Sequence, residues 1–139
     1  MQKDEKATIK AFVVREKQKQ FLSFIANPED RWLFTSELPN FQWFELRYAT
    51  LVPWKVNPAL LALGQRFSGI SNLVHLLRSK GAKDSCWVIS ANPQIDGREM
   101  SLGSALDAVA ESDWGTILSF LPGRLAYFKG LGEALLLSR

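Results

Sequence analysis

The chain has one cysteine and one histidine among its 139 residues, Cys86 and His75. A lone cysteine excludes an internal disulfide bond. The two residues together supply too few ligands for a structural zinc site, which takes four. The sequence therefore predicts a protein without a metal ion, and no pattern in it indicates a cofactor.

A long apolar run is also absent, since no segment approaches the ~18 apolar residues that a membrane-spanning helix needs. The first six residues, MQKDEK, are mostly charged, and no apolar segment of signal-peptide type follows them. These absences predict an intracellular, cytoplasmic protein that does not bind a membrane. Hydrophobic residues make up 47% of the chain, as is usual for a folded protein, and the length favours one domain over residues 1–139.

The motifs of several enzyme classes are missing as well. The chain has no Walker A loop for nucleotide phosphates, no GxGxxG fingerprint for dinucleotides and no Gly-x-Ser-x-Gly elbow for a nucleophilic serine. Cys86 and His75 are a formal nucleophile and base. However, Cys86 opens an apolar run, which favours a buried structural thiol. The sequence thus favours a non-enzymatic protein.

The last third of the chain carries the clearest fold signal. Its helix has apolar residues at i, i+3, i+4, i+7 and i+8 from Leu102, which is typical of an amphipathic helix. The expected elements are a strand over 86–90, a polar loop over 92–99, a helix from Ser101 to about Glu111, strands over 115–121 and 124–129, and a last strand over 135–137.

The turn at Pro122-Gly123 conflicts with a tight hairpin between the last two long strands. Two-residue hairpin loops need a positive φ at their first position, which proline cannot adopt. We therefore expect a wider loop or a bulge near Gly123. Both faces of these strands are apolar, so either helices cover one face and a partner the other, or the sheet is buried on both sides.

Helices dominate the expected structure of the first 80 residues. One continuous helix over 9–25 is a poor fit, because the apolar groups at its two ends lie roughly 100° apart around the axis. The sequence predicts an irregular or extended start over 8–14, helices over 15–26, from Asn27-Pro28 to about Leu38, and over 67–80 before Gly81, and a further helix start at Asn57-Pro58. The fold class is therefore α+β: a helical N-terminal part packed on a small, mainly antiparallel C-terminal sheet that one helix crosses.

Aromatic residues are densest between Trp32 and Trp54, where seven of the sixteen lie. Seven large rings in a segment broken by Pro39 and Pro53 are hard to bury completely, although a core built from these rings is the alternative. Our leading hypothesis is a binding protein whose exposed rings contact a protein partner or a second copy in a homodimer. The candidate surface residues are Trp32, Trp43, Phe44, Tyr48 and Trp54.

Basic residues are concentrated between Leu46 and Lys83, a stretch that contains no Asp or Glu. Such a charge excess is one way to bind a nucleic acid or another polyanion. Six cations over so long a stretch can equally be spread over several solvated faces, which places this hypothesis second. The candidates are Arg47, Lys55, Arg66, Arg78, Lys80 and Lys83.

The polar loop over 92–99 gives a third hypothesis, a small ligand-binding or hydrolytic domain. Its candidates are Asp96, Arg98 and Glu99, since carboxylates that flank an arginine can transfer protons or bind a polar ligand. Asp96-Gly97 is also a common turn dipeptide, so the loop can equally be a plain turn.

Overall fold

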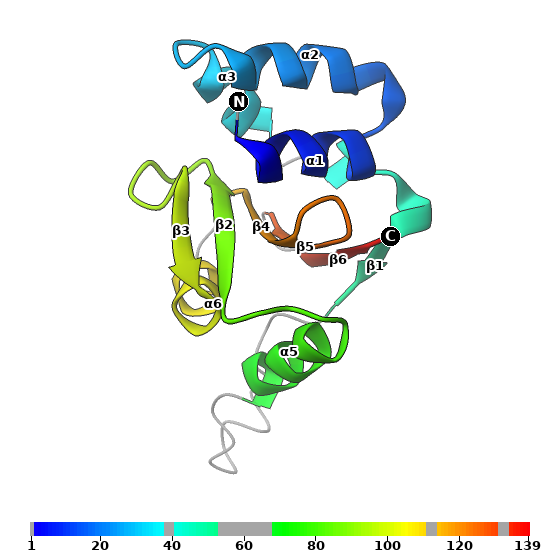
Figure 1. Ribbon diagram of the computed structural model, residues 1–139, viewed down its shortest axis with the longest axis vertical. Coiled ribbons are helices and arrows are strands. Elements are labelled where there is room, and N and C mark those ends of the chain that lie inside the picture. Colours follow the sequence, from blue (N-terminus) through cyan, green and yellow to red (C-terminus); the bar gives the residue numbers. More distant parts are fainter. Residues whose placement is uncertain (1, 38–40, 53–67, 111–113, 131–133) are drawn as a thin grey trace.

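The computed structural model describes residues 2–37, 41–52, 68–110, 114–130 and 134–139. Within these ranges, helices lie mainly in the N-terminal half and strands in the C-terminal half, which confirms the α+β class (Figure 1). The helices are α1 (Lys3–Phe12), α2 (Arg15–Ala26), α3 (Arg31–Glu37), α5 (Ser68–Ser79) and α6 (Leu102–Ala110), with short 3₁₀ turns η1 (Phe41–Trp43) and η2 (Leu46–Tyr48). The strands are β1 (Ala49–Leu51), β2 (Ser85–Ser90), β3 (Arg98–Ser101), β4 (Thr116–Leu121), β5 (Leu125–Lys129) and β6 (Ala134–Ser138).

The six described strands form one sheet in the order β1-β6-β5-β4-β2-β3. Every neighbouring pair in it is antiparallel, as the sequence predicted for most of the sheet. The short strands β1 and β3 lie at the two edges, and β4, β5 and β6 lie in the middle. Since α6 connects β3 to β4, it is the helix that crosses the sheet.

Helices lie on both sides of this sheet, with α1, α2 and α3 on one face and α5 and α6 on the other (Figure 1). Alternate strand residues therefore enter two separate apolar cores. Ile117 and Phe128 pack with Phe12 in the first core, whereas Leu118 and Tyr127 pack in the second. The apolar character of both strand faces is explained by burial on both sides within the described chain.

Most of the predicted C-terminal elements are confirmed, including β2, α6, β4, β5 and β6, and so are α2 and α5 in the N-terminal half. Gly81 ends α5 with a φ of 104°, which glycine adopts without steric cost. The hairpin also behaves as expected. Arg124 N–H donates to Leu121 C=O at 2.9 Å, and the β4–β5 register shifts between Ser119 and Leu121.

The predicted irregular start over 8–14 is wrong, because α1 spans most of that segment. The Gln2 side chain caps α1 by accepting a hydrogen bond from Glu5 N–H at 3.0 Å. The helix ends at Phe12, and the next residue, Val13, is extended and forms an isolated bridge with Phe44. The change of apolar face was correctly detected, but it reflects two helices joined at 13–14 rather than the absence of the first.

Two strands and the start of one helix also differ from the expectation. The two edge strands β1 and β3 were not predicted, so Arg98 and Glu99 belong to a strand rather than to the loop. The helix expected from Asn27 begins at Arg31, since Asn27 Oδ1 accepts Glu29 N–H at 3.1 Å in a turn that precedes it. The helix start expected at 57–58 lies outside the described residues.

Among the described helices, none combines the length and apolar character that crossing a bilayer requires.

Replacing Gly123 with alanine is expected to destabilise the fold. Gly123 has a φ of 72°, and an added Cβ would lie 3.5 Å from Ala7 Cβ, an ordinary contact. The cost is therefore that of placing alanine in the left-handed backbone region. We expect the free energy of unfolding, measured by urea denaturation, to fall by about 1–2 kcal/mol. Gly103→Ala in α6 is the control, because its Cβ would meet nothing within 4 Å. It should leave stability unchanged or raise it, and equal losses in both variants would contradict the turn's role.

Candidate functional site

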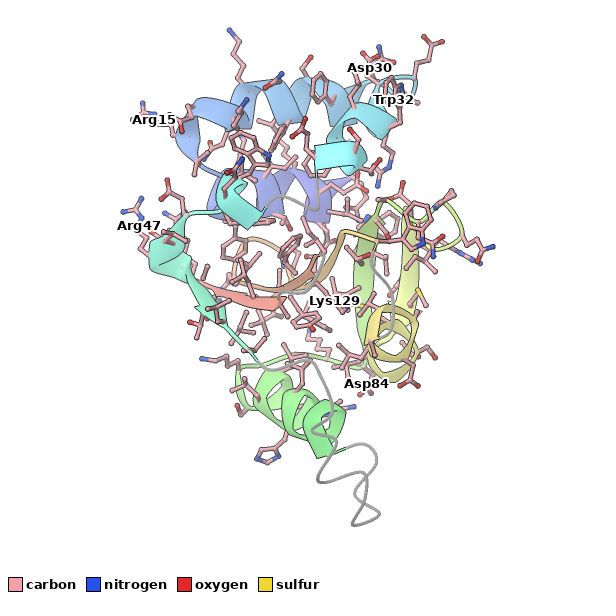
Figure 2. All side chains as sticks on the ribbon, turned by 180° about the vertical axis from the view of Figure 1, so that it is seen from behind. Arg15, Asp30, Trp32, Arg47, Asp84 and Lys129 are labelled. Atoms are coloured by element: carbon pink, nitrogen blue, oxygen red, sulfur yellow. The ribbon has the colours of Figure 1, made fainter. Side chains whose placement is uncertain are left out.

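The aromatic candidates do not form one surface. Phe44 is buried and packs on Phe128, with ring centroids 4.7 Å apart. Trp32 on α3 is 64% exposed. It projects near Asp30, far from Arg47 in Figure 2. Trp54 lies outside the described residues.

The two remaining rings are half-buried and already have cationic partners. Lys17 Nζ lies 4.5 Å from the Trp43 ring, and Trp43 Nε1–H donates to Glu37 at 3.1 Å. The guanidinium carbons of Arg47 and Arg139 lie 4.9 and 4.7 Å from the Tyr48 ring. The aromatic segment thus contributes more to the first core than to a continuous exposed surface among the residues described.

The described basic candidates fall into two places. Arg47 lies in η2, whereas Arg78 of α5 pairs with Asp84 at 2.9 Å, and Figure 2 shows Arg47 and Asp84 far apart. Lys80 and Lys83 are exposed in the same short segment between α5 and β2. Lys55 and Arg66 lie outside the described residues. No single basic surface is formed by the four candidates that are described.

The three polar-loop candidates separate in the same way. Asp96 turns toward Arg31 on α3, and both of its carboxylate oxygens accept hydrogen bonds from that guanidinium. Arg98 is exposed and donates to the Gln94 carbonyl at 2.9 Å. Glu99 points from β3 into a pocket, described below, that neither of the others lines.

Arg31 is the centre of an ionic network that joins α1, α3 and the loop after β2. Its guanidinium donates to Glu5 at 2.7 and 2.8 Å and to Asp96 at 2.7 and 2.8 Å. Glu5 is only 3% exposed, and its Oε2 also accepts Trp87 Nε1–H at 2.8 Å. The hydrogen bonds with Asp96 raise the pKa of Arg31; burial opposes them, and Glu5 raises it further. Arg31 therefore stays charged and binds both carboxylates through two hydrogen bonds each.

Sequence reasoning missed Arg31 and Glu5 because their partners lie far away along the chain. Glu5 is 26 residues from Arg31 and 82 from Trp87, and Arg31 is 65 residues from Asp96. No local spacing marks such a set. The acids in the first turn of α1 were the available signal, but acids there are common on any helix.

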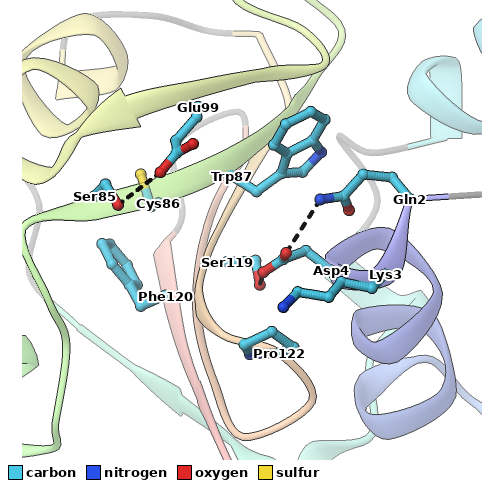
Figure 3. A pocket seen from close by; sticks show the side chains of 10 residues that line it. All are labelled: Gln2, Lys3, Asp4, Ser85, Cys86, Trp87, Glu99, Ser119, Phe120 and Pro122. Carbon is cyan, nitrogen blue, oxygen red and sulfur yellow. Dashed lines mark hydrogen bonds between the residues drawn. The ribbon is translucent and has the colours of Figure 1, made fainter.

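A pocket of about 350 Å³ lies beside this network, between the start of α1 and the sheet (Figure 3). Its walls come from four separate segments of the chain, and most of its side chains are polar. The lining residues are Gln2, Lys3, Asp4, Ser85, Cys86, Trp87, Glu99, Ser119, Phe120 and Pro122.

The pocket arises where β2 and β4 separate. Their pairing begins at Ser90 and Thr116 and stops at Trp87 and Ser119, next to the register shift in β4. Ser85 therefore lies beyond the paired part of the two strands, where no β4 residue faces it in the register. The first turn of α1 covers the resulting gap and forms the remaining wall.

Hydrogen bonds hold the two carboxylates of the pocket in place. Asp4 accepts from Ser119 Oγ at 2.9 Å and from Gln2 Nε2 at 3.1 Å. Glu99 accepts from Ser85 Oγ at 3.0 Å. Because a carboxylate can accept about four hydrogen bonds, both groups have acceptor capacity left.

The Cys86 thiol is not an activated nucleophile. Burial raises its pKa to about 12, and the negative charges of Glu99 and Asp4 add to that effect. Since the thiolate is the reactive form, the thiol stays protonated and inert at neutral pH. The interpretation of Cys86 as a structural residue therefore agrees with its surroundings.

The described side chains include no group of three or more His, Cys, Asp and Glu residues arranged to hold a metal ion.

Comparison of the chain with protein families, with curated proteins and with solved structures found no match.

Arg31→Ala is expected to lower the free energy of unfolding by about 3 kcal/mol, because it leaves Glu5 as an uncompensated buried charge. Arg78→Ala is the control. It breaks an exposed pair whose side chains are 51% and 90% accessible, and should cost less than about 1 kcal/mol. Urea denaturation of the two variants measures the difference. Similar losses would show that the Arg31 network is no more important than a surface ion pair.

Proposed function

We propose that this protein is a ligand-binding domain and that its binding site is the pocket between α1 and the β2, β3 and β4 strands. The observation that carries the proposal is the convergence of hydrogen-bonding side chains from distant segments around one cavity. Gln2 and Asp4 come from the start of α1, Ser85 and Glu99 from β2 and β3, and Ser119 from β4.

The size and rigidity of the cavity support this role. A volume of about 350 Å³ suits a small molecule, since ligand sites typically span roughly 300–1,000 Å³. Its side chains are mounted on strands and on a capped helix, which position polar groups more accurately than loops do. Trp87 is fixed further by its hydrogen bond to buried Glu5.

Part of the third sequence hypothesis is retained in this proposal. Glu99 lines the cavity directly, whereas Asp96 acts at a distance. Asp96 holds Arg31, Arg31 holds Glu5, and Glu5 holds the Trp87 indole. Arg98 has no part in the site, because its side chain bonds the Gln94 carbonyl.

A fragment screen followed by NMR tests the proposal. We expect at least one polar fragment to shift the Trp87 indole N–H signal in a saturable way. Ser85→Phe should abolish the shift by filling the cavity, while Ser23→Phe, at an exposed site on α2, should not. The absence of any fragment with this behaviour, or equal binding to the Ser85→Phe variant, would overturn the proposal.

Self-association is a second candidate function, favoured by the edge of the sheet at β1. Leu46 and Leu51 are 72% and 70% exposed there, and β1 pairs only with β6 in the described sheet. An exposed strand edge flanked by apolar side chains is suited to pairing with a second copy of the chain.

Light scattering over a range of concentrations tests this second candidate. We expect the wild-type chain to dimerise and Leu51→Lys to remain monomeric. Trp32→Lys, which changes an equally exposed apolar residue on α3, should still dimerise. A wild-type monomer at high concentration would exclude association at this edge.

A further inference from the structure

The charges and the aromatic ring around the pocket point to one class of ligand. We propose that the pocket binds an organic cation, such as a primary or quaternary amine, between Asp4, Trp87 and Glu99. This inference rests on the proposed ligand-binding function and specifies its chemistry.

The three groups have complementary positions. Trp87 and Glu99 are direct cross-strand partners on β2 and β3, so their side chains share one face of the sheet. Asp4 stands at the start of α1, and Figure 3 shows Asp4 on the α1 side of the pocket and Glu99 on the β3 side, with Trp87 nearby. An indole near two carboxylates attracts cations through both its ring quadrupole and their negative charge.

The charges of both carboxylates also act on Cys86, a lining residue whose side chain packs in the second core. Burial is the main cause that raises the pKa of its thiol, and the charges of Glu99 and Asp4 add to that effect. The same two charges favour a positive group in the pocket that Asp4 and Glu99 both line.

Two positive features of the same wall oppose the binding of a cation, but neither outweighs the two carboxylates. Lys3 lines the pocket and is exposed to solvent, as Glu99 is, so solvent and salt screen both charges. The N-terminus of α1 carries a partial positive charge. However, Gln2 caps it, and both Asp4 and Glu5 lie in its first turn. Two carboxylates against one ammonium leave the ionisable lining with a net negative charge.

The hydrogen-bonding capacity of the site also suits an ammonium group. Glu99 Oε1 accepts one bond from Ser85, and each oxygen of Asp4 accepts one. A primary ammonium offers three donors and no acceptor. The remaining lone pairs of the two carboxylates can take these donors without breaking the bonds that hold them.

Four probes of similar size test the inference: butylammonium, tetramethylammonium, butanol and butyrate. Binding is measured through the Trp87 indole N–H signal and by calorimetry at neutral pH. We expect both cations to bind at least about fivefold more tightly than butanol, and butyrate to bind most weakly. Binding of the cations should also weaken as salt is added.

Substitutions that remove charge but keep shape identify the groups responsible. Glu99→Gln and Asp4→Asn should each weaken butylammonium binding by roughly fivefold or more. Glu16→Gln, on the exposed side of α2, should leave it unchanged. Because Asp4 is tied to Ser119, thermal unfolding of the Asp4→Asn variant is checked first, and Glu99→Gln changes an exposed residue whose glutamine oxygen can still accept from Ser85.

The outcomes separate this inference from the proposed function. Equal or tighter binding of butanol or butyrate at the Trp87 signal would overturn the cation inference and leave the pocket as a binding site. The cation inference would also be overturned if none of the four probes bound although the fragment screen had found a ligand of the pocket. If the screen also finds no pocket ligand, the proposed function itself fails.

Discussion

The guanidinium of Arg31 holds together three segments that have no proximity in sequence. It binds Glu5 on α1 and Asp96 in the loop after β2, while its own backbone belongs to α3. Glu5 in turn binds the Trp87 indole on β2. Since a buried charge is stable only when it is paired, buried Glu5 requires Arg31. The start of α1 is thereby set against the sheet at one defined place.

The pocket exists because of that placement and because β2 and β4 separate. Without the first turn of α1, the gap beyond Trp87 and Ser119 would be an open depression on one face of the sheet. With it, the gap becomes a walled cavity in which Asp4 faces Glu99. The proposed binding site is therefore a joint product of strand register and the Arg31 network, and its cation preference follows from which side chains those two constraints bring together.

Local patterns predicted much of the fold and little of the site. Elements with strong periodicity or clear end signals, such as α2, α5 and the hairpin at Pro122-Gly123, were found from the sequence alone. The edge strands β1 and β3 were missed because they are short and polar or exposed, and only their pairing with β6 and β2 makes them strands. Of the surface, basic and polar-loop candidates that the structure describes, Glu99 alone lines the cavity, and Asp96 in the same 92–99 segment points to Arg31 instead.

The amino-acid sequence by itself determined the α+β class and a sheet with two apolar faces, because these follow from composition, periodicity and turn chemistry, which are local properties. It also excluded a disulfide, since one cysteine cannot form an internal one. Only the tertiary structure decided which aromatic rings are buried, where the basic residues lie, and that Glu5, Arg31 and Asp96 meet. Those outcomes depend on contacts between residues far apart in the chain, such as Glu5 and Trp87, which are 82 positions apart, and no pattern within a single element encodes them.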